Sequence, residues 1–345
     1  MNKSVNRSAA QKKRNLHQHF VLIVLSIFIV VAFIISMNTG LVRLSPAEVI
    51  QTLFGFGTEK QSLVLFEFRL PRIILAVLVG MSLAISGCIL QSISGNSLAD
   101  PGILGINAGA GLTVVLFISL FPGNVATSVY LLPILAFGGA GITAFVIYIL
   151  AYKRHEGISP TRLLLTGVAV SAGISAAMIV LTLRLNPDKY QFVATWLAGS
   201  IWGSNWTFVL SLLPWLLILI PFVFSKAQVL NVLSLGDSMA TGLGATIERE
   251  RRFLLIAAVG LAGASVSVSG GIGFVGLIGP HLARQLVGSR HQFLIPTSAL
   301  VGGLLVIVAD AIGRWILQPS EIPTGIVVAV IGAPYFLYLL SRSKA

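Results

Sequence analysis

Long apolar runs separated by short polar segments occupy the chain from Val21 to Leu340. Each run has roughly the 17 to 25 residues that a helix needs to cross a hydrocarbon core about 30 Å thick. Helices are the expected form of these runs, because no water satisfies the backbone inside a bilayer. The pattern predicts an all-α membrane protein with about ten transmembrane segments, placed at 20–37, 71–90, 102–121, 128–151, 162–184, 206–224, 253–269, 272–287, 294–313 and 323–341.

The seventh and eighth segments lie close together, because only Gly270 and Gly271 separate them. One of the two is therefore expected to be short or broken. Glycine also recurs between Gly270 and Pro280, where a helix should be continuous. A broken helix is tolerated at membrane depth only where protein or a water-filled cavity covers the backbone. The run predicts either a break that lines a pathway or a plain tight turn.

Three connections are longer than turns. Segment 38–70 contains Ser45 followed by Pro46, which predicts a short external helix with the serine as its N-cap. Segment 189–200 mixes apolar and polar residues in the manner of an amphipathic helix at the membrane interface. Segment 225–252 is the longest polar connection on the side of the N-terminus. These connections are the candidates for contacts outside the bilayer.

Two of the apolar segments resemble each other faintly. Residues 80–87 and 263–270 both carry glycine at the first and last positions and serine at the third and seventh. In the predicted topology they run through the membrane in opposite directions, as the halves of an inverted-topology repeat do. The pattern therefore indicates a weak inverted repeat.

Composition and charge support a membrane protein and set its orientation. Only 10% of the 345 residues are charged, whereas about 25% are charged in soluble domains. The net charge of +12 is spread over short segments between apolar runs, which argues against nucleic-acid binding. With ten crossings, 16 Lys and Arg fall on the side of the N-terminus and 7 on the other. The positive-inside rule then places both termini in the cytoplasm.

The N-terminal region has the order of a signal peptide, with a basic stretch before an apolar run. The run 20–37 is too long for that role, and no small-residue cleavage site follows it. We therefore expect a cytoplasmic basic tail at 1–19 and a single transmembrane domain at 20–345.

Catalytic and cofactor motifs are missing from the sequence. Cys88 is the single cysteine, so neither an internal disulfide nor a CxxC site is possible. The chain contains no GxxxxGK[ST], HExxH or GxSxG motif. An intramembrane enzyme is disfavoured, and no cofactor is expected. A transporter with this sequence would draw its energy from another subunit or from an ion gradient.

Charged residues near the outer ends of the segments need partners. Asp310 and Arg314 are four residues apart, so they can pair on one helix face. Asp310 could instead serve as a proton relay, and it would be the coupling group of an ion-gradient-driven secondary transporter. Arg69 and Arg72 precede the second segment on the outside, against both the helix macrodipole and the positive-inside bias. An acidic partner outside the membrane would explain their placement.

Six stretches carry a resemblance to a known family. They are RLPR at 69–72, AISG at 84–87, NSLADPGILG at 96–105, RLLLTGV at 162–168, GIGFVGLIGPH at 271–281 and EIPTG at 321–325. Together they resemble the FecCD-type permeases, the membrane subunits of ABC importers for iron-siderophore, haem and cobalamin compounds. The resemblance extends over nearly the whole chain after about residue 40.

The resemblance implies a type II ABC importer permease fold in the bacterial plasma membrane. The chain would translocate an iron-siderophore or a related chelate into the cytoplasm by alternating access, without an ATPase site of its own. The implied partners are a second permease subunit, identical or paralogous, two cytoplasmic ABC ATPases and an extracytoplasmic substrate-binding protein.

The resemblance also implies residue roles. Arg69, Arg72 and Arg314 would meet glutamates of the binding protein. Coupling to the ATPase would involve Leu235, Gly236, Asp237, Ala240, Gly242, Leu243 and Gly244. An inner gate would involve Asn96, Leu98, Pro160 and Thr161. Pro160 departs from the Ser/Thr-rich turn that relatives often carry, which weakens the transfer of the gate assignment.

Overall fold

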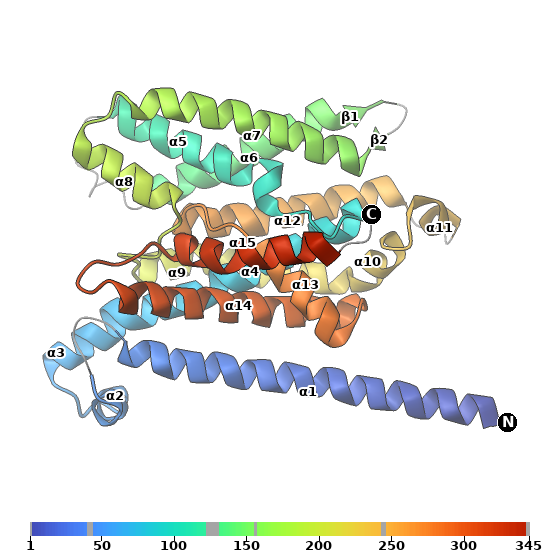
Figure 1. Cartoon of the computed structure of the whole chain (residues 1–345), viewed down its shortest axis with the longest axis horizontal. Coiled ribbons are helices and arrows are strands. Elements are labelled where there is room, and N and C mark those ends of the chain that lie inside the picture. Colours follow the sequence, from blue (N-terminus) through green and yellow to red (C-terminus); the bar gives the residue numbers. More distant parts are fainter. Residues whose placement is uncertain (1, 40–43, 122–130, 155–156, 243–245, 343–345) are drawn as a thin grey trace.

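Helices form nearly all of the chain in the computed structural model, which describes residues 2–39, 44–121, 131–154, 157–242 and 246–342. The long helices lie side by side along one direction, and short helices sit at both ends of the bundle (Figure 1). The two chain ends both point toward the end that carries α11.

The elements follow one another in a simple order. The helices are α1 (Asn2–Asn38), α2 (Pro46–Leu53), α3 (Glu59–Ser62), a π-helix (Leu63–Arg69), α4 (Leu70–Ser94), a 3₁₀-helix (Pro101–Leu104), α5 (Ile106–Leu120), α6 (Leu131–Ala151), α7 (Pro160–Thr182), α8 (Pro187–Leu197), α9 (Trp206–Ser225), α10 (Ala227–Leu233), α11 (Asp237–Gly242), α12 (Ile247–Ser269), α13 (Val275–Val287), α14 (His291–Ile316) and α15 (Thr324–Arg342). Strands β1 (Tyr152–Lys153) and β2 (Gly157–Ile158) form a small antiparallel hairpin.

Each of the ten predicted membrane segments coincides with a helix. Seven helices within the described residues are long and apolar enough to cross a membrane, and α5 and α15 are shorter apolar helices. The tenth is α13, which has only 13 residues. The first three residues of the predicted segment 128–151 lie outside the described part of the chain. The sequence thus predicted the number and order of the segments, and the expected short one is the eighth.

The core of the bundle is built on small residues. In α4, α12 and α14 most of the apolar window is buried, whereas α7 is buried over only 11% of its window. A side-chain carbon at Gly80 would lie 2.2 Å from the backbone oxygen of Gly302, and one at Gly87 would lie 1.8 Å from that of Gly276. Small residues allow this backbone contact, which replaces the hydrophobic effect as the source of helix association in lipid.

The helices that carry the two repeat segments, α4 and α12, pack against each other. Ser82 Oγ donates to the backbone oxygen of Leu261 at 2.9 Å, and Ser86 Oγ donates to that of Ala258 at 2.7 Å. As the residue number rises along α4 it falls along α12, so the two helices are antiparallel. The serines of the α4 segment therefore bond α12 just before residues 263–270.

The start of the second membrane segment differs from the prediction. The helix does not begin at Pro71 but runs without interruption from Glu59 to Ser94. A π-helix makes this possible, since the Leu70 N–H bonds the oxygen of Leu65, five residues back. In the same register Pro71 would bond Phe66, but proline has no N–H. The indole N–H of Trp206 donates to the Phe66 oxygen instead, at 2.8 Å.

Local sequence signals explain two short elements between the long helices, α2 and α8. Ser45 and Glu48 form a reciprocal capping box at the start of α2, as the serine–proline pair predicted. The segment expected to be amphipathic forms α8, which Asn186 caps by accepting from the Lys189 N–H at 2.9 Å. Both predicted helices are confirmed.

The glycine run 270–274 connects α12 to α13 and is covered by protein. A side-chain carbon at Gly270 would lie 2.0 Å from the oxygen of Trp196, and one at Gly199 would lie 2.8 Å from Ile272. Phe274 then begins α13 with a φ of 65°, a left-handed conformation that is rare for a bulky residue. Packing under the end of α8 satisfies the requirement for cover at membrane depth.

Candidate functional site

Three arginines from distant parts of the chain meet at the end of the bundle opposite α11. Arg72 of α4 donates to Asp310 of α14 at 2.9 Å and to Glu321, just before α15, at 2.8 Å. Arg314 Nε lies 3.0 Å from the second oxygen of Asp310. The predicted Asp310–Arg314 ion pair is present, and Asp310 is held between two guanidinium groups. We call Arg69, Arg72, Asp310, Arg314 and Glu321 the outer ion cluster, because the predicted topology places this end outside the cell.

The C-terminal end of α1 completes this cluster. Arg314 Nη1 donates to the backbone oxygens of Ser36 and Thr39, at 3.2 and 3.1 Å. Arg69 Nη1 donates to the backbone oxygen of Met37. Cations are stabilised at a helix C-terminus, where the last carbonyls lack partners and the macrodipole is negative. The helix end thus helps to neutralise Arg69 and Arg314.

In this structure the chain itself supplies two acidic partners for Arg72, namely Asp310 and Glu321. Sequence reasoning noted that Arg69 and Arg72 need an anion, but it did not connect them with Asp310, Glu321 or the end of α1. These partners lie far apart in sequence, so no local spacing reveals the contact. Arg69 and Arg314 are only 6% and 4% exposed. Their side chains therefore contribute to the packing of the fold, in addition to any contact with an external partner. Their docking role stays a prediction.

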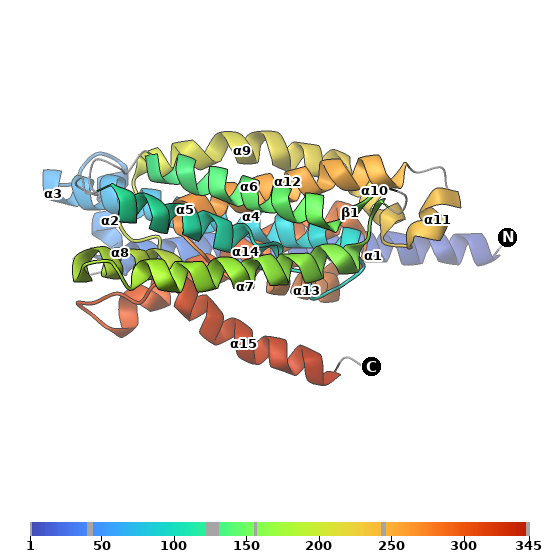
Figure 2. The ribbon, with the colours of Figure 1, turned by 90° about the horizontal axis from the view of Figure 1, so that it is seen from above.

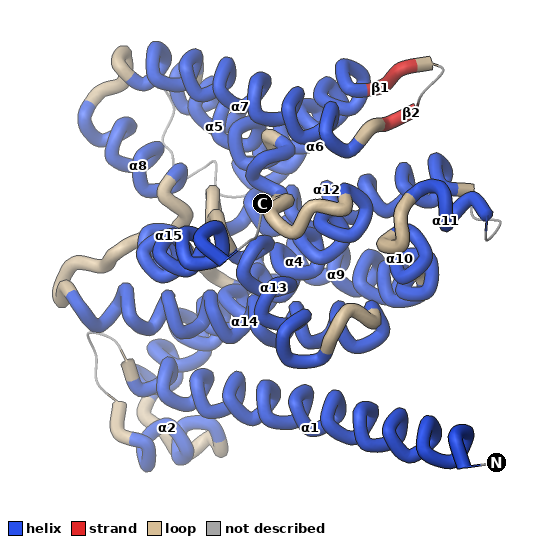
Figure 3. Tube along the Cα trace, turned by 45° about the vertical axis from the view of Figure 1, so that its right-hand side comes forward, coloured by secondary structure: helices blue, strands red, loops and turns tan. Residues whose placement is uncertain are grey.

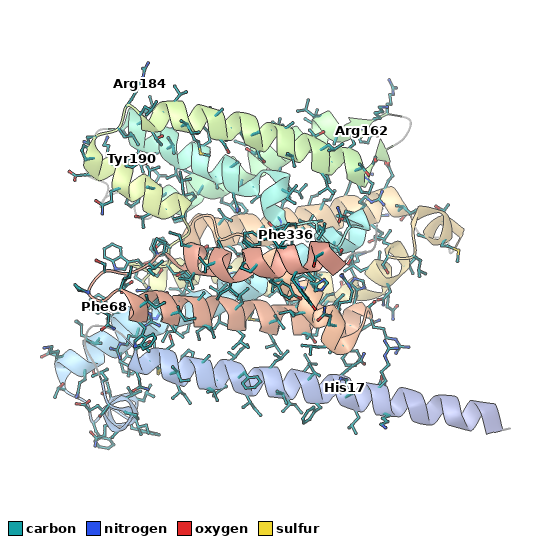
Figure 4. All side chains as sticks on the ribbon, in the orientation of Figure 1. His17, Phe68, Arg162, Arg184, Tyr190 and Phe336 are labelled. Atoms are coloured by element: carbon teal, nitrogen blue, oxygen red, sulfur yellow. The ribbon has the colours of Figure 1, made fainter. Side chains whose placement is uncertain are left out.

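Aromatic and cationic side chains mark this end. Phe68, next to Arg69, is 61% exposed, and Figure 4 shows it at the same end as Arg184 and Tyr190. Arg162 lies at the other end, beside β2 (Figure 4). Its guanidinium Nη1 donates to the carbonyl of Ala151 at 3.4 Å. The two ends are therefore different in character: one has a buried ion cluster and the other exposed basic loops.

Short helices α10 and α11 form the candidate coupling element at the basic end. Leu235 is 58% exposed and Met239 is 62% exposed, whereas Ala240 is fully buried. Gly236 adopts a φ of 96° between the two helices, a conformation that favours glycine. Asp237 and Gly242 are the ends of α11. Leu243 and Gly244, for which the resemblance also implies a coupling role, lie outside the described residues.

A polar chain of contacts links the coupling element to the core. Asn231 of α10 accepts from the His291 backbone N–H at 2.9 Å and also lies 2.9 Å from its Nδ1. The His291 Nε2 lies 2.6 Å from the hydroxyl of Ser92 in α4. The Asn231 side chain also donates to Gln292 at 3.0 Å. Sequence reasoning missed these residues, because an isolated asparagine and histidine carry no motif.

The proposed inner-gate residues lie at the same basic end. Asn96 accepts from the Leu98 N–H at 2.9 Å in the loop after α4. Pro160 and Thr161 begin α7, where a proline without an N–H is well tolerated. Pro160 lines a small cavity with Ala99 and Asp100 of the loop after α4. The two predicted parts of the gate are neighbours, and their gating role stays a prediction.

Two ionisable residues, Asp100 and Arg251, line this small cavity. The Asp100 carboxylate caps the 3₁₀-helix by accepting from the Gly102 N–H at 2.7 Å. Burial raises the pKa of Asp100 to about 6, and the hydrogen bond from Gly102 lowers it by less. Within the described residues, no cluster of three or more His, Cys, Asp or Glu side chains is arranged to hold a metal ion.

Membrane-length helices, with a buried ion cluster at one end and short helices with exposed apolar side chains at the other, are typical of a polytopic membrane protein. The family model of the FecCD transport family matches residues 28–342. The chain therefore belongs to this family, and it is a permease of the ABC importer class.

Relatives and a solved structure agree with this assignment. The Bacillus subtilis protein "Iron(3+)-hydroxamate import system permease protein FhuG" is 50% identical over 328 residues, which is 94% of this chain and 97% of the relative. The Escherichia coli protein "Fe(3+) dicitrate transport system permease protein FecD" is 39% identical over 93% of this chain and 99% of its own length. A metal-chelate type ABC transporter solved in an inward-facing conformation has a TM-score of 0.80 and 31% identity, over 93% of this chain and 99% of that chain.

Proposed function

We propose that this permease translocates a ferric siderophore into the cytoplasm, and that its substrate is a ferric hydroxamate. The full-length similarity to a hydroxamate importer subunit, at 50% identity, carries this proposal. The similarity to a ferric dicitrate permease is lower, at 39%. The conversion is transport without covalent chemistry, so the chain would supply a pathway and its gates rather than a catalytic group.

Uptake of labelled iron tests the substrate. A strain that lacks this chain should lose uptake of a radiolabelled ferric hydroxamate, and a plasmid copy should restore it, while uptake of ferric citrate stays unchanged. If ferric citrate uptake is lost instead, the proposed substrate is wrong, but the proposed importer function stands. Uptake that is unaffected in both cases would refute the proposed function.

The energy source is proposed to be ATP hydrolysed by two partner subunits that dock on α11. Support comes from Leu235 and Met239, whose exposed apolar side chains project at the basic end and suit a groove on a soluble partner. In the described structure Asp310 is paired with Arg72 and Arg314, which disfavours it as a proton-coupling group. Uptake should stop when the catalytic glutamate of the ATPase is replaced. Uptake that continues would favour the ion-gradient mechanism.

A second permease subunit is proposed to pack on α7 and α15. Apolar side chains along α7 remain open, with Leu165 67% and Ile179 63% exposed, and Val330 of α15 is 69% exposed. Figure 2 shows α15 leaving the bundle at an angle, beside the edge formed by α7. Two such faces could enclose the translocation pathway between two subunits. Cross-linking between cysteines at 179 and 330 of neighbouring subunits would test this arrangement.

The outer end is proposed to receive an extracytoplasmic binding protein at the outer ion cluster. Support comes from the charged side chains that gather at this end, because directional arginine–carboxylate pairs suit the docking of an acidic surface. Arg69→Glu should abolish uptake, and a reciprocal glutamate-to-arginine change on the binding protein should restore it. Rescue would separate docking from a structural role, because a folding defect cannot be repaired by the partner's charge.

A further inference from the structure

A half-open apolar groove runs along the side of the bundle, apart from the outer ion cluster and the coupling helices. It has a volume of about 510 Å³ and lies between α6, α9 and α12. Phe137, Gly141, Phe145 and Tyr148 line it from α6 at intervals of three or four residues, so they form one helix face. This size is typical of sites for small molecules.

Glycine creates the space in this groove. A side-chain carbon at Gly141 would meet no atom within 4 Å, so the site is empty rather than packed. Phe137 and Trp215 also line the groove, with ring centroids 4.6 Å apart. Phe137 is the first lining residue on α6, so this aromatic pair lies at one end of the groove.

The length of the groove corresponds to one leaflet of a bilayer. The helix rise of 1.5 Å per residue separates Phe137 and Tyr148 by about 16 Å along α6. Half of the hydrocarbon core is about 15 Å. Residues beside the groove face outward, since Ile142 is 67% exposed and Ile256 is 66% exposed. These apolar side chains are typical of a lipid-facing surface.

Arg252 is the charged residue that lines the groove. It lies in the first turns of α12, at the end opposite the Phe137–Trp215 pair, and its side chain is exposed. Its Nε donates to the carbonyl of Glu248 at 3.4 Å. Arginine places its charge at the membrane interface while its stem lies along apolar surface. Basic pockets between transmembrane helices bind anionic lipid headgroups.

We propose that this groove binds one acyl chain of an anionic phospholipid, with the headgroup phosphate on Arg252. The terminal methyl group of the lipid acyl chain lies near the Phe137–Trp215 pair, and Gly141 leaves room for the methylene groups of the lipid. The site depends on the membrane placement of the bundle and not on the transported substrate. The proposed orientation assigns the lipid to the cytoplasmic leaflet.

Native mass spectrometry of the assembled importer tests the site with phosphatidylglycerol and phosphatidylcholine. The wild type should retain phosphatidylglycerol about fivefold more strongly, the contribution expected from one cation near an anionic headgroup. Arg252→Gln should remove this preference, whereas Arg249→Gln should not, because Arg249 lies over Phe253 outside the groove. Equal retention of the two lipids by the wild type would overturn the headgroup assignment.

Filling the groove tests the acyl-chain site. Gly141→Phe should abolish the strongly retained lipid, and Gly138→Phe is the matched control, because Gly138 is also in open space on α6 but does not line the groove. Lipid retention by Gly141→Phe would refute the proposal. A second measurement does not require a substitution that fills the groove. Because Trp215 lines the groove, acyl-brominated phosphatidylglycerol should quench tryptophan fluorescence more in the wild type than in Trp215→Phe. Equal quenching would also refute it.

Discussion

Asp310 is the residue on which the outer ion cluster depends, since it pairs with Arg72 and Arg314 while almost completely buried. Removal of one partner from a buried pair leaves an uncompensated charge and costs about 3–5 kcal/mol. Asp310→Asn should therefore lower the thermal midpoint of the purified protein strongly. The measurement is unfolding in detergent, followed by tryptophan fluorescence.

Glu321 provides the matched control for that variant. It also pairs with Arg72, but its side chain is 24% exposed, so water replaces part of the lost interaction. Glu321→Gln should lower the midpoint clearly less than Asp310→Asn does. Equal effects of the two substitutions would contradict the view that burial of Asp310 sets the stability of the cluster.

Asp100 predicts a pH dependence of stability. Its pKa in the folded protein, about 6, lies above its ordinary value of 3.8, so the folded state binds the proton more tightly. The contribution of this group to stability is full below pH 3.8 and is lost as the pH rises through 6. Asp100→Asn keeps an acceptor for the Gly102 N–H and removes the titration. The difference in thermal midpoint between variant and wild type should therefore grow between pH 4 and pH 6, in favour of the variant, and a constant difference would contradict the assignment.

Only part of these residue contacts was predictable. The Asp310–Arg314 pair follows from a spacing of four on one helix, so the sequence alone predicts it. Arg72 and Glu321 reach Asp310 only after three separate segments have packed together. The same holds for Asn231 and His291, because their contact crosses 60 positions of the chain. Local periodicity does not reveal contacts of this kind.

At the scale of helices, packing through glycine decides how closely α4 approaches α13 and α14. A methyl group at Gly87 would lie 1.8 Å from the Gly276 oxygen, and that atom belongs to backbone that cannot turn away. Gly87→Ala should destabilise the protein by about 1–3 kcal/mol or more, as overpacking of a core does. The measurement is again the thermal midpoint in detergent.

Gly138 again supplies the comparison. It lies on α6, where an added side chain meets nothing within 4 Å. Gly138→Ala should leave stability within about 1 kcal/mol, with a slight gain from the higher helix propensity of alanine. A midpoint for Gly87→Ala that equals that of Gly138→Ala would show that α4 and α13 can separate without cost.

Element boundaries were predictable where local chemistry sets them. Ser45, Pro46 and Glu48 specify the start of α2 through a capping box, so that helix could be placed from the sequence. The π-helix before α4 could not, because the indole that bonds its free Phe66 carbonyl comes from Trp206, 140 positions further along the chain. The sequence also could not show which residues cover the backbone of the glycine run 270–274. The structure shows that the end of α8 covers it.

At the scale of the whole molecule, the alternation of apolar and basic segments predicts the fold almost completely. A helix in lipid satisfies its own backbone, so each apolar run becomes one crossing, and their number and order follow directly. Sequence patterns do not show which helices form the centre. The structure places α4, α12 and α14 there and leaves α7 and α15 with open faces, which is the arrangement a second subunit requires.

The orientation of the bundle is the remaining large-scale prediction, and chemical labelling decides it. Phe56 is 83% exposed beside α2, whereas Met239 is exposed on α11 at the opposite end (Figure 3). Cys88 is fully buried and should not react. A membrane-impermeant maleimide should label Phe56→Cys in intact cells and Met239→Cys only in inverted vesicles.

Arg154→Cys, in the hairpin between β1 and β2, gives a second position at the same end as Met239, so the result does not depend on whether an ATPase covers α11. It should also react only in inverted vesicles. If both Met239→Cys and Arg154→Cys are labelled from outside intact cells, the true orientation is the reverse of the predicted one. The outer ion cluster would then face the cytoplasm and the exposed Leu235 and Met239 the exterior, so that neither the binding protein nor the ATPase could reach its proposed surface.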